Sequence, residues 1–223
     1  MTGFQDSDAV ARYAEAPPRL VPGFHDMQRM VAVLLAEHVP DDGRVLVLGA
    51  GGGLETKVFA SGNPGWSFDG VDPSQPMLDL AAQTLREHED RVSLHHGDIE
   101  VAPDGPFDAA VCLLTMHFIP LAERLPTLQA LRRRLKPGAP FVCMHHSIPG
   151  DGAERATWFS RFAAFAVSSG IASENMENAA KTMSERLAIL TPAQDEALLR
   201  EGGFTGIETF YTAFTFRGWV ALA

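Results

Sequence analysis

The stretch VLVLGAGGGLET, residues 45–56, places four apolar residues directly before a loop with four glycines in five positions. A helix-like stretch begins behind the loop at Leu54. Glycine directly after a buried strand lets the backbone approach a ligand closely, and the next helix presents its first N–H groups to that ligand. This order predicts an α/β fold with a nucleotide-type ligand at the turn.

Composition bounds the class of protein. The chain has 223 residues, of which 46% are hydrophobic and 21% charged, so we expect one domain over residues 1–223. No apolar run reaches the ~18 residues of a membrane span. The first twenty residues lack the basic-then-apolar order of a signal peptide, so a cytoplasmic location is expected.

The net charge and the two cysteines bear on which binding partners and cross-links the protein has. The net charge of −10 argues against a nucleic-acid partner, because such binding rests on basic patches. The basic run at 131–138 is expected to be the solvated end of a helix. Cys112 and Cys143 lie in strand-like runs and are expected to be buried thiols, with a disulfide or metal pair as the alternative.

Apolar strand-like runs alternate with helical stretches through most of the chain. The strand-like runs are 44–49, 66–72, 92–96, 107–114 and 140–146. The helical stretches between them are 54–60, 75–89 and 121–135. This alternation indicates a parallel sheet covered by helices on both faces.

The alternation of strand-like and helical stretches ends after residue 146. Residues 150–170 and 173–190 look like two extra helices, and a third begins at Pro192 with Thr191 as its cap and Gly202 past its end. The last nineteen residues, 205–223, are typical of two tightly joined strands. An antiparallel pair is therefore expected at one edge of the sheet.

The spacing of the glycines favours one cofactor over another. A dinucleotide fingerprint needs a glycine at position 54, where this chain has leucine. The pattern Gly49-x-Gly51-x-Gly53 instead resembles the first motif of the class I S-adenosylmethionine-dependent methyltransferases. A purely structural tight turn is the alternative.

Acids end the second and third predicted strands. Asp72 suits a ribose, because one carboxylate can accept from both hydroxyls, although an N-terminal helix cap is the alternative. By the methyltransferase resemblance, Asp98 accepts from the adenine amino group and Ile99 lies beside the ring. A loop-capping role for Asp98 stays open.

Within the methyltransferase class, the chain resembles one family more than the others. The bacterial carboxy-S-adenosylmethionine synthases look similar to it over three longer stretches, 19–39, 107–142 and 202–223. This implies a three-layer Rossmann-like class I methyltransferase fold, α/β, with a mostly parallel seven-stranded sheet and an antiparallel C-terminal strand. It also implies a homodimer. Residues 1–40 are then an N-terminal helical cap, and 151–190 are a helical insertion forming a lid or dimer face. The implied cofactor residues are Arg19, Gly49, Ala50, Gly51, Gly53, Asp72, Pro73, Met77, Asp98, Ile99 and Leu114.

One family feature is missing. The methyltransferases carry Asp or Glu two residues before the first glycine, where it helps to hold the methionine ammonium group; this chain has Val47. The lost contact is worth roughly 1.5–3 kcal/mol. Backbone carbonyls of Gly49, Leu113 and Leu114 could take the ammonium, and Arg19 resembles the family's cap arginine. Weakened cofactor binding is expected, and a protein without catalytic activity stays an alternative.

Histidines are the candidate catalytic residues. His117 follows the fourth predicted strand, and His145 and His146 end the fifth, at the sheet edge where ligands of α/β proteins bind. Strand alternation turns one of the adjacent pair toward the pocket and the other toward the core. An imidazole base is needed only for a hydroxyl or protonated amine acceptor. No metal-ligand spacing is present among them.

The sequence therefore predicts a methyltransferase that uses S-adenosylmethionine, releases S-adenosylhomocysteine and acts on a small molecule. The rival is a carboxy-S-adenosylmethionine synthase, which carboxylates the cofactor with prephenate. In that family an arginine on the last helix reaches the added carboxylate, and Leu198 occupies its place here. A non-catalytic cofactor-binding protein is the third hypothesis.

Overall fold

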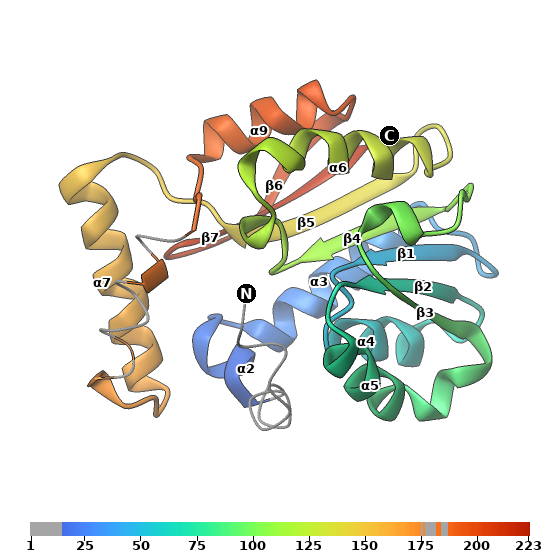
Figure 1. Ribbon diagram of the computed structural model, residues 1–223, viewed down its shortest axis with the longest axis horizontal. Helices are drawn as coiled ribbons and strands as arrows, with labels where there is room; N and C mark the ends of the chain where they lie inside the picture. The colour runs from blue at the N-terminus through green and yellow to red at the C-terminus, as the bar shows by residue number, and fades with distance from the viewer. Residues whose placement is uncertain (1–14, 175, 177–181, 184–186) are drawn as a thin grey trace.

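One mixed sheet organises the chain. The computed structural model describes residues 15–174, 176, 182–183 and 187–223. Seven strands run in the order β3-β2-β1-β4-β5-β7-β6 (Figure 1). Strand β7 pairs antiparallel with β5 and β6, and the other pairs are parallel. The strands are β1 (Arg44–Leu48), β2 (Ser67–Asp72), β3 (Val92–His96), β4 (Ala109–Leu113), β5 (Pro140–His146), β6 (Thr205–Ala213) and β7 (Phe216–Leu222). The expected fold class is confirmed.

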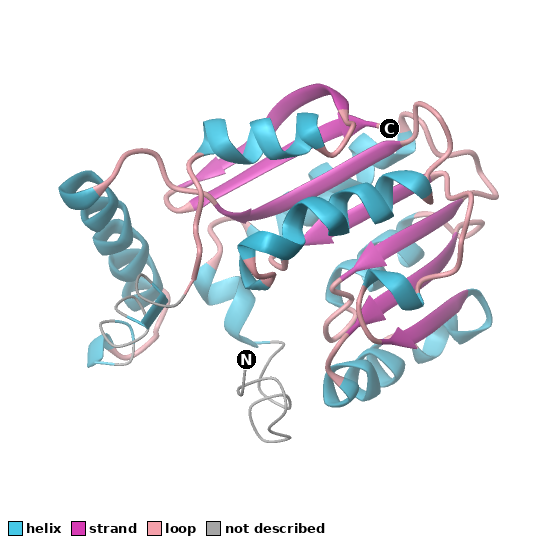
Figure 2. Cartoon of the chain, turned by 45° about the horizontal axis from the view of Figure 1, so that its top comes forward, coloured by secondary structure: helices cyan, strands magenta, loops and turns pink. Residues whose placement is uncertain are grey.

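Helices cover both faces of this sheet. Helices α6 and α9 lie side by side on one face, and α3 and α4 pack on the other (Figures 1 and 2). The helices are α2 (Ala16–Leu20), α3 (Phe24–Ala36), α4 (Leu54–Gly62), α5 (Gln75–Thr84), α6 (Leu121–Arg133), α7 (Gly152–Ser168) and α9 (Pro192–Glu201). Three 3₁₀ turns are η3 (Arg86–Arg91), η4 (Ile99–Val101) and η5 (Met116–Phe118).

Each face of the sheet has its own apolar core. Successive residues of β1 alternate between them: Val45 and Val47 face α3 and α4, whereas Leu46 and Leu48 belong to the core under α6 and α9. All seven residues of β5 are buried. Because both faces are covered, the central strands read as continuous apolar runs, which is why they were recognisable in the sequence.

The strand order reverses direction at the centre of the sheet. Strand β1 pairs with β2 on one side and with β4 on the other, so the connections from these strands depart to opposite sides. In open α/β sheets a ligand binds outside the carboxyl ends of the strands at such a switch point. Helix α7 lies beyond the ends of β5 and β7 (Figure 1) and contacts α2. Its Phe162 packs against His146 of β5 and Phe216 of β7.

Several expected boundaries shift. The helix expected over 75–89 ends at Thr84 and continues as the η3 turn, and the strand expected over 107–114 begins at Ala109. The basic run at 131–138 is only partly a solvated helix end. Arg134 is buried there, and its guanidinium donates to the carbonyl of Ala130 at 2.9 Å. A run of basic residues in the sequence does not reveal which of them is buried in the folded protein.

Other expectations concern the segments around the sheet. Cys112 and Cys143 are buried and free, as expected. Within the N-terminal cap expected over 1–40, α2 and α3 form, and residues 1–14 lie outside the described part. Half of the second extra helix expected over 173–190 lies outside it as well. No helix in the described residues is long and apolar enough to cross a membrane.

We predict that Thr191 contributes measurably to folding through its cap on α9. Its hydroxyl accepts from Gln194 N–H, and the Gln194 side chain accepts from Thr191 N–H in return. Thr191→Ala should lower the free energy of unfolding by about 1 kcal/mol in urea titrations. The control Thr157→Ala, at an exposed mid-helix position, should change it by no more than about 0.5 kcal/mol. Equal losses would contradict the capping assignment.

Candidate functional site

The glycine loop folds back onto the end of β2. The N–H groups of Gly49 and Ala50 both donate to the carbonyl of Val71, at 2.8 and 2.9 Å. Gly49 has a φ of +77°, and a Cβ there would lie 2.0 Å from Thr115 Oγ1. Gly53 has a φ of +78° and is the N-cap residue of α4. The loop therefore needs glycine both for backbone conformation and for close packing.

Asp72 ties this loop to β2. Its Oδ2 accepts from Gly51 N–H and its Oδ1 from Ser74 N–H, each at 2.9 Å. Burial raises the pKa of Asp72, and these two backbone bonds and His96 act against that rise. The cap of α5 is Ser74, whose hydroxyl accepts from Met77 N–H. Each carboxylate oxygen of Asp72 keeps acceptor capacity for a ligand hydroxyl.

A first cavity of about 370 Å³, here called the loop cavity, opens beside the glycine loop. It brings together Gly49, Pro73, Asp98 and Ile99 from three separate strand ends. Asp98 caps the η4 turn by accepting from Glu100 N–H at 2.9 Å and stays exposed. The other residues that line the loop cavity are Leu48, Gly97, Glu100, Thr115, Phe118, Ile119, Pro120, Glu123, Pro126 and Thr127.

A second cavity of about 380 Å³, here called the histidine cavity, lies between the ends of β4 and β5 and helices α2 and α7. Leu114, His117 and His146 line it together with Phe162 of α7. Its other walls are Pro17, Leu20, Val21, Phe118, Ile171, Met176, Met183, Leu187 and Phe216. Phe118 lines both cavities, so they are neighbours.

The backbone between the cavities is strained. Leu114, directly after β4, has a φ of +56°, which is uncommon for a residue with a side chain. Its N–H donates to the carbonyl of Met144 at 2.6 Å, which holds the turn against β5. Such strain persists where the surroundings enforce it and is concentrated at functional sites.

His117 and His146 form a pair on the wall of the histidine cavity. Their ring centroids are 4.7 Å apart, and the N–H of His146 donates to His117 Nδ1 at 3.4 Å. His146 Nδ1 lies 2.9 Å from Thr215 Oγ1, and its ring stacks on Phe216. Burial lowers the pKa of His146 to about 3 and lowers that of His117 well below its ordinary value. Both imidazoles are therefore neutral at physiological pH.

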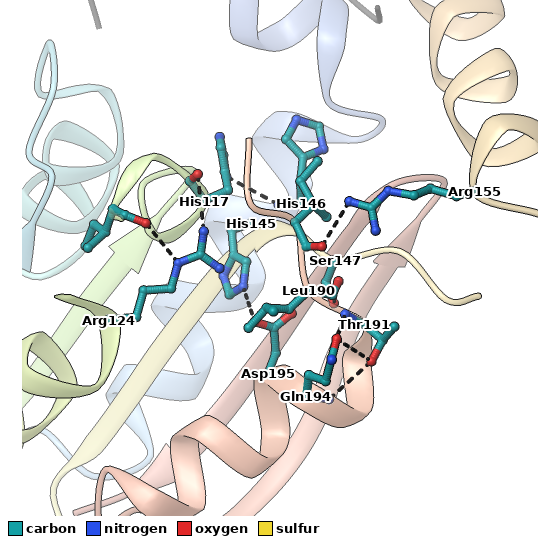
Figure 3. A network of polar contacts seen from close by, with 12 residues as sticks. His117, Arg124, His145, His146, Ser147, Arg155, Leu190, Thr191, Gln194 and Asp195 are labelled. Carbon is teal, nitrogen blue, oxygen red and sulfur yellow. Dashed lines mark hydrogen bonds and ion pairs between the residues drawn. The ribbon is translucent and has the colours of Figure 1, made fainter. Parts of the chain in front are cut away.

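His145 points to the opposite face of the sheet (Figure 3). Its Nε2 lies 3.2 Å from Asp195 Oδ1 of α9, and its ring lies 5.5 Å from that of Trp219. The alternation expected for the two histidines is correct, but His145 is not among the residues lining either cavity. The sequence offered no means to decide which of the two faces the cavity.

Buried Arg124 connects the two faces near the strand ends (Figure 3). Its Nε donates to the carbonyl of Ile119 at 3.0 Å and its Nη2 to that of His117 at 3.4 Å. Burial lowers the pKa of Arg124, and the charge of Asp195 acts against that fall. Arg124 thus holds the η5 turn that carries His117, a role that sequence reasoning missed because the run around it reads as an ordinary helix.

Two expected cofactor residues, Arg19 and Met77, lie elsewhere, and so does Val47, where the family's acid is missing. Arg19, in α2, is half-exposed and pairs with Glu15, and it is absent from the walls of both cavities. Met77 packs inside the domain, in the first turn of α5. Val47 is fully buried in the core under α3 and α4. No cluster of side chains suited to a metal ion occurs among the described residues.

Comparison with known proteins relates part of this arrangement to a described family. Residues 46–141, from β1 to the start of β5, match the family model described as a methyltransferase domain. The match covers less than half of the chain. A carboxy-S-adenosyl-L-methionine synthase from Chromohalobacter salexigens is 26% identical over 97% of this chain and 82% of its own length.

Solved structures of methyltransferases share the fold of this chain. Phosphoethanolamine N-methyltransferase 2 of Haemonchus contortus, in complex with S-adenosyl-L-methionine, superposes with a TM-score of 0.71 at 15% identity. That match covers 100% of this chain and 60% of the other. Human N-acetylserotonin methyltransferase, in complex with S-adenosylmethionine, gives 0.65 at 16% identity, over 98% of this chain and 57% of the other. The fold is that of the S-adenosylmethionine-dependent methyltransferases.

We predict that Gly49→Ala destabilises the protein far more than Gly138→Ala. Both glycines have a φ of +77°, but a Cβ at Gly138 would meet nothing within 4 Å. The shared backbone strain costs about 1–2 kcal/mol. The clash with Thr115 should add about 1–3 kcal/mol at Gly49 alone. Urea unfolding of the two variants measures the difference, and equal destabilisation would contradict the close packing of the loop.

Proposed function

We propose that the protein binds S-adenosylmethionine at the glycine loop and transfers its methyl group to a small acceptor in the histidine cavity. The observation that carries this proposal is the pair of neighbouring cavities that share Phe118 at the switch point of a methyltransferase fold. In the transfer, a lone pair of the acceptor attacks the methyl carbon as the carbon–sulfur bond breaks. S-adenosylhomocysteine leaves as the product.

The cofactor residues divide by the part of the ligand they would hold. Asp72 accepts from the ribose hydroxyls with the lone pairs that its backbone bonds leave free. Asp98, exposed at the rim of the loop cavity, accepts from the adenine amino group, and buried Ile99 packs on the ring. Pro73 packs beside it, and the bare backbone of the glycine loop lies along the methionine part.

Positioning dominates catalysis in this proposal. A sulfonium is already activated, and correct alignment of two reactants supplies ~7–11 kcal/mol of barrier reduction. With His117 Nδ1 accepting from His146 N–H, a neutral His117 carries its proton on Nε2 and acts as a hydrogen-bond donor. His146 is a weak base, because burial lowers its pKa to about 3. His145 then acts through its contact with Asp195 and not on the acceptor.

The walls of the histidine cavity favour an uncharged acceptor. Apart from the two neutral imidazoles, its described walls are aliphatic, aromatic and methionine side chains. An ionised group would lose its hydration there without a charged partner. A small, largely apolar molecule with one nucleophilic atom fits these walls best.

A carboxy-S-adenosylmethionine synthase is the second candidate, favoured by the relatives that match nearly the whole chain. The sequence resemblance places Leu198 where that family has the arginine that reaches the carboxylate. Leu198 is half-buried and packs against the core under α6 and α9. Leucine offers no charge to a carboxylate, so methyl transfer is the better-supported activity. A homodimer, a cytoplasmic location and a non-catalytic binding role stay predictions.

We predict that Asp72→Ala weakens S-adenosylhomocysteine binding by about 1.5–3 kcal/mol, because it removes a charge-assisted acceptor. Isothermal titration calorimetry measures the loss. The control Asp79→Ala removes an exposed carboxylate of α5 that binds Gln75 and should leave the affinity unchanged. Wild-type affinity in the Asp72 variant would show that the ribose lies elsewhere.

A second prediction separates the two enzymatic candidates. Incubation of the protein with S-adenosylmethionine and prephenate should yield no carboxylated cofactor, because Leu198 provides no cation for the new carboxylate. Mass spectrometry of the small-molecule fraction measures the product, with Leu198→Arg as the comparison protein. Carboxylated cofactor formed at multiple turnovers by the wild type would reverse the ranking.

A further inference from the structure

Helix α6 carries a buried arginine near each of its ends. Arg124 lies near its start and is 1% exposed, and Arg134 is its C-cap residue and is 7% exposed. Burying a guanidinium costs solvation energy, and arginine is almost never fully buried without partners. Two such residues on one helix therefore have a role beyond packing, which their hydrogen bonds indicate.

Arg124 holds the η5 turn at two points. Its Nη2 donates to the carbonyl of His117 at 3.4 Å (Figure 3). Its Nε donates to the carbonyl of Ile119, the C-cap residue of the turn, at 3.0 Å. Phe118 and Ile119 line the loop cavity, whereas Arg124 does not. The guanidinium thus fixes one wall of the loop cavity from outside it.

Arg134 makes corresponding contacts with the η4 turn. Its Nε donates to the carbonyl of Ala102, the C-cap residue of η4, at 3.4 Å, and its Nη2 lies 3.7 Å from Glu100 Oε2. Its Nη1 donates to the carbonyl of Ala130 on α6 at 2.9 Å. Ile99 and Glu100 of η4 line the loop cavity as well. A second wall of the same cavity is therefore tied to the same helix.

Helix α6 also lines the loop cavity directly, through Glu123, Pro126 and Thr127, and it contacts η4. We propose that Arg124 and Arg134 are positioning residues, which hold η5 and η4 at the separation that the nucleoside of the cofactor requires. This rests on the proposed function, in which the residues at η4 hold the adenine.

The test replaces each arginine by lysine. A planar guanidinium binds two acceptors at once, whereas an ammonium group on a flexible stem does not hold both in place. Arg124→Lys and Arg134→Lys should each weaken S-adenosylhomocysteine about 3- to 10-fold in calorimetry, because a wall that is no longer held must be ordered when the ligand binds. The ligand 5′-methylthioadenosine, which has the same nucleoside without the amino-acid part, should lose affinity by the same factor.

Arg91 supplies a matched control. Its guanidinium donates to three backbone carbonyls, those of Ala60, Asn63 and Trp66. It lines neither cavity. Arg91→Lys should lower the melting temperature, as the Arg124 and Arg134 variants do, but bind both ligands like the wild type. A merely structural role of the two α6 arginines predicts the same binding result for all three variants.

Isoleucine methyl signals in NMR report the two walls separately in the free protein, because Ile119 ends η5 and Ile99 lies in η4. Arg124→Lys should shift the δ1-methyl signal of Ile119 more than that of Ile99. Arg134→Lys should do the reverse, and Arg91→Lys should shift neither. Where a lysine variant does not fold, the glutamine variant of the same position, which keeps one amide donor, takes its place.

The possible failures are distinguishable. If the wild type binds neither ligand, the proposed function fails, and the binding role of the two arginines fails with it. If the wild type binds both, but the Arg124 and Arg134 variants bind equally well, the arginines do not position the nucleoside and the proposed function stands. Equal affinity losses in the Arg91 variant, or shifts of both methyl signals in every variant, would also overturn the positioning role.

Discussion

The contact between the glycine loop and the end of β2 determines the rest of the site. Two successive N–H groups, those of Gly49 and Ala50, share the carbonyl of Val71, and the next glycine donates to Asp72. This fold-back is possible because Gly49 can approach Thr115 without a Cβ between them. It leaves Gly49, at the carboxyl end of β1, and Thr115, after β4, on the wall of the loop cavity.

Charge is distributed unequally around that space. The loop side holds Asp72, a buried acid that accepts two backbone N–H groups, and Asp98, an exposed acid. The histidine cavity holds two imidazoles whose pKa values are lowered by burial, so it carries no charge near neutral pH. A cationic cofactor suits the first side and an uncharged acceptor the second. The difference in polarity thus supports the proposed direction of transfer, from the loop cavity toward the histidine cavity.

The shared fold does not name the acceptor. The nematode and human methyltransferases superpose on the chain at 15% and 16% identity, which establishes the arrangement of strands and helices. Acceptor specificity depends on side chains grafted on that frame. In this protein the walls of the histidine cavity come in part from α2, α7 and the η5 turn, whose residues Leu20, Phe162 and His117 meet only in the folded chain.

Much of the fold was predictable because its signals are local. Continuous apolar runs separated by helical stretches gave a parallel sheet, and the glycine spacing gave the position of the loop. The antiparallel C-terminal pair and the helix start at Thr191 follow from turn and capping residues within a few positions of each other. Alternation along β5 predicted that His145 and His146 face opposite ways, since successive side chains of a strand do so.

The tertiary structure decided which groups are buried together and therefore what their charges do. His146 is a weak base because folding buries it, with Phe216, 70 positions away, stacked on its ring. Arg134 is buried although its neighbours in the sequence are basic and solvated. Glu55 is an ordinary acid in the sequence, and only its burial in the folded chain, with a smaller effect from the charge of Asp72, raises its pKa. Sequence periodicity specifies the face on which a residue lies, whereas solvation and electrostatic partners depend on chain segments that folding brings together.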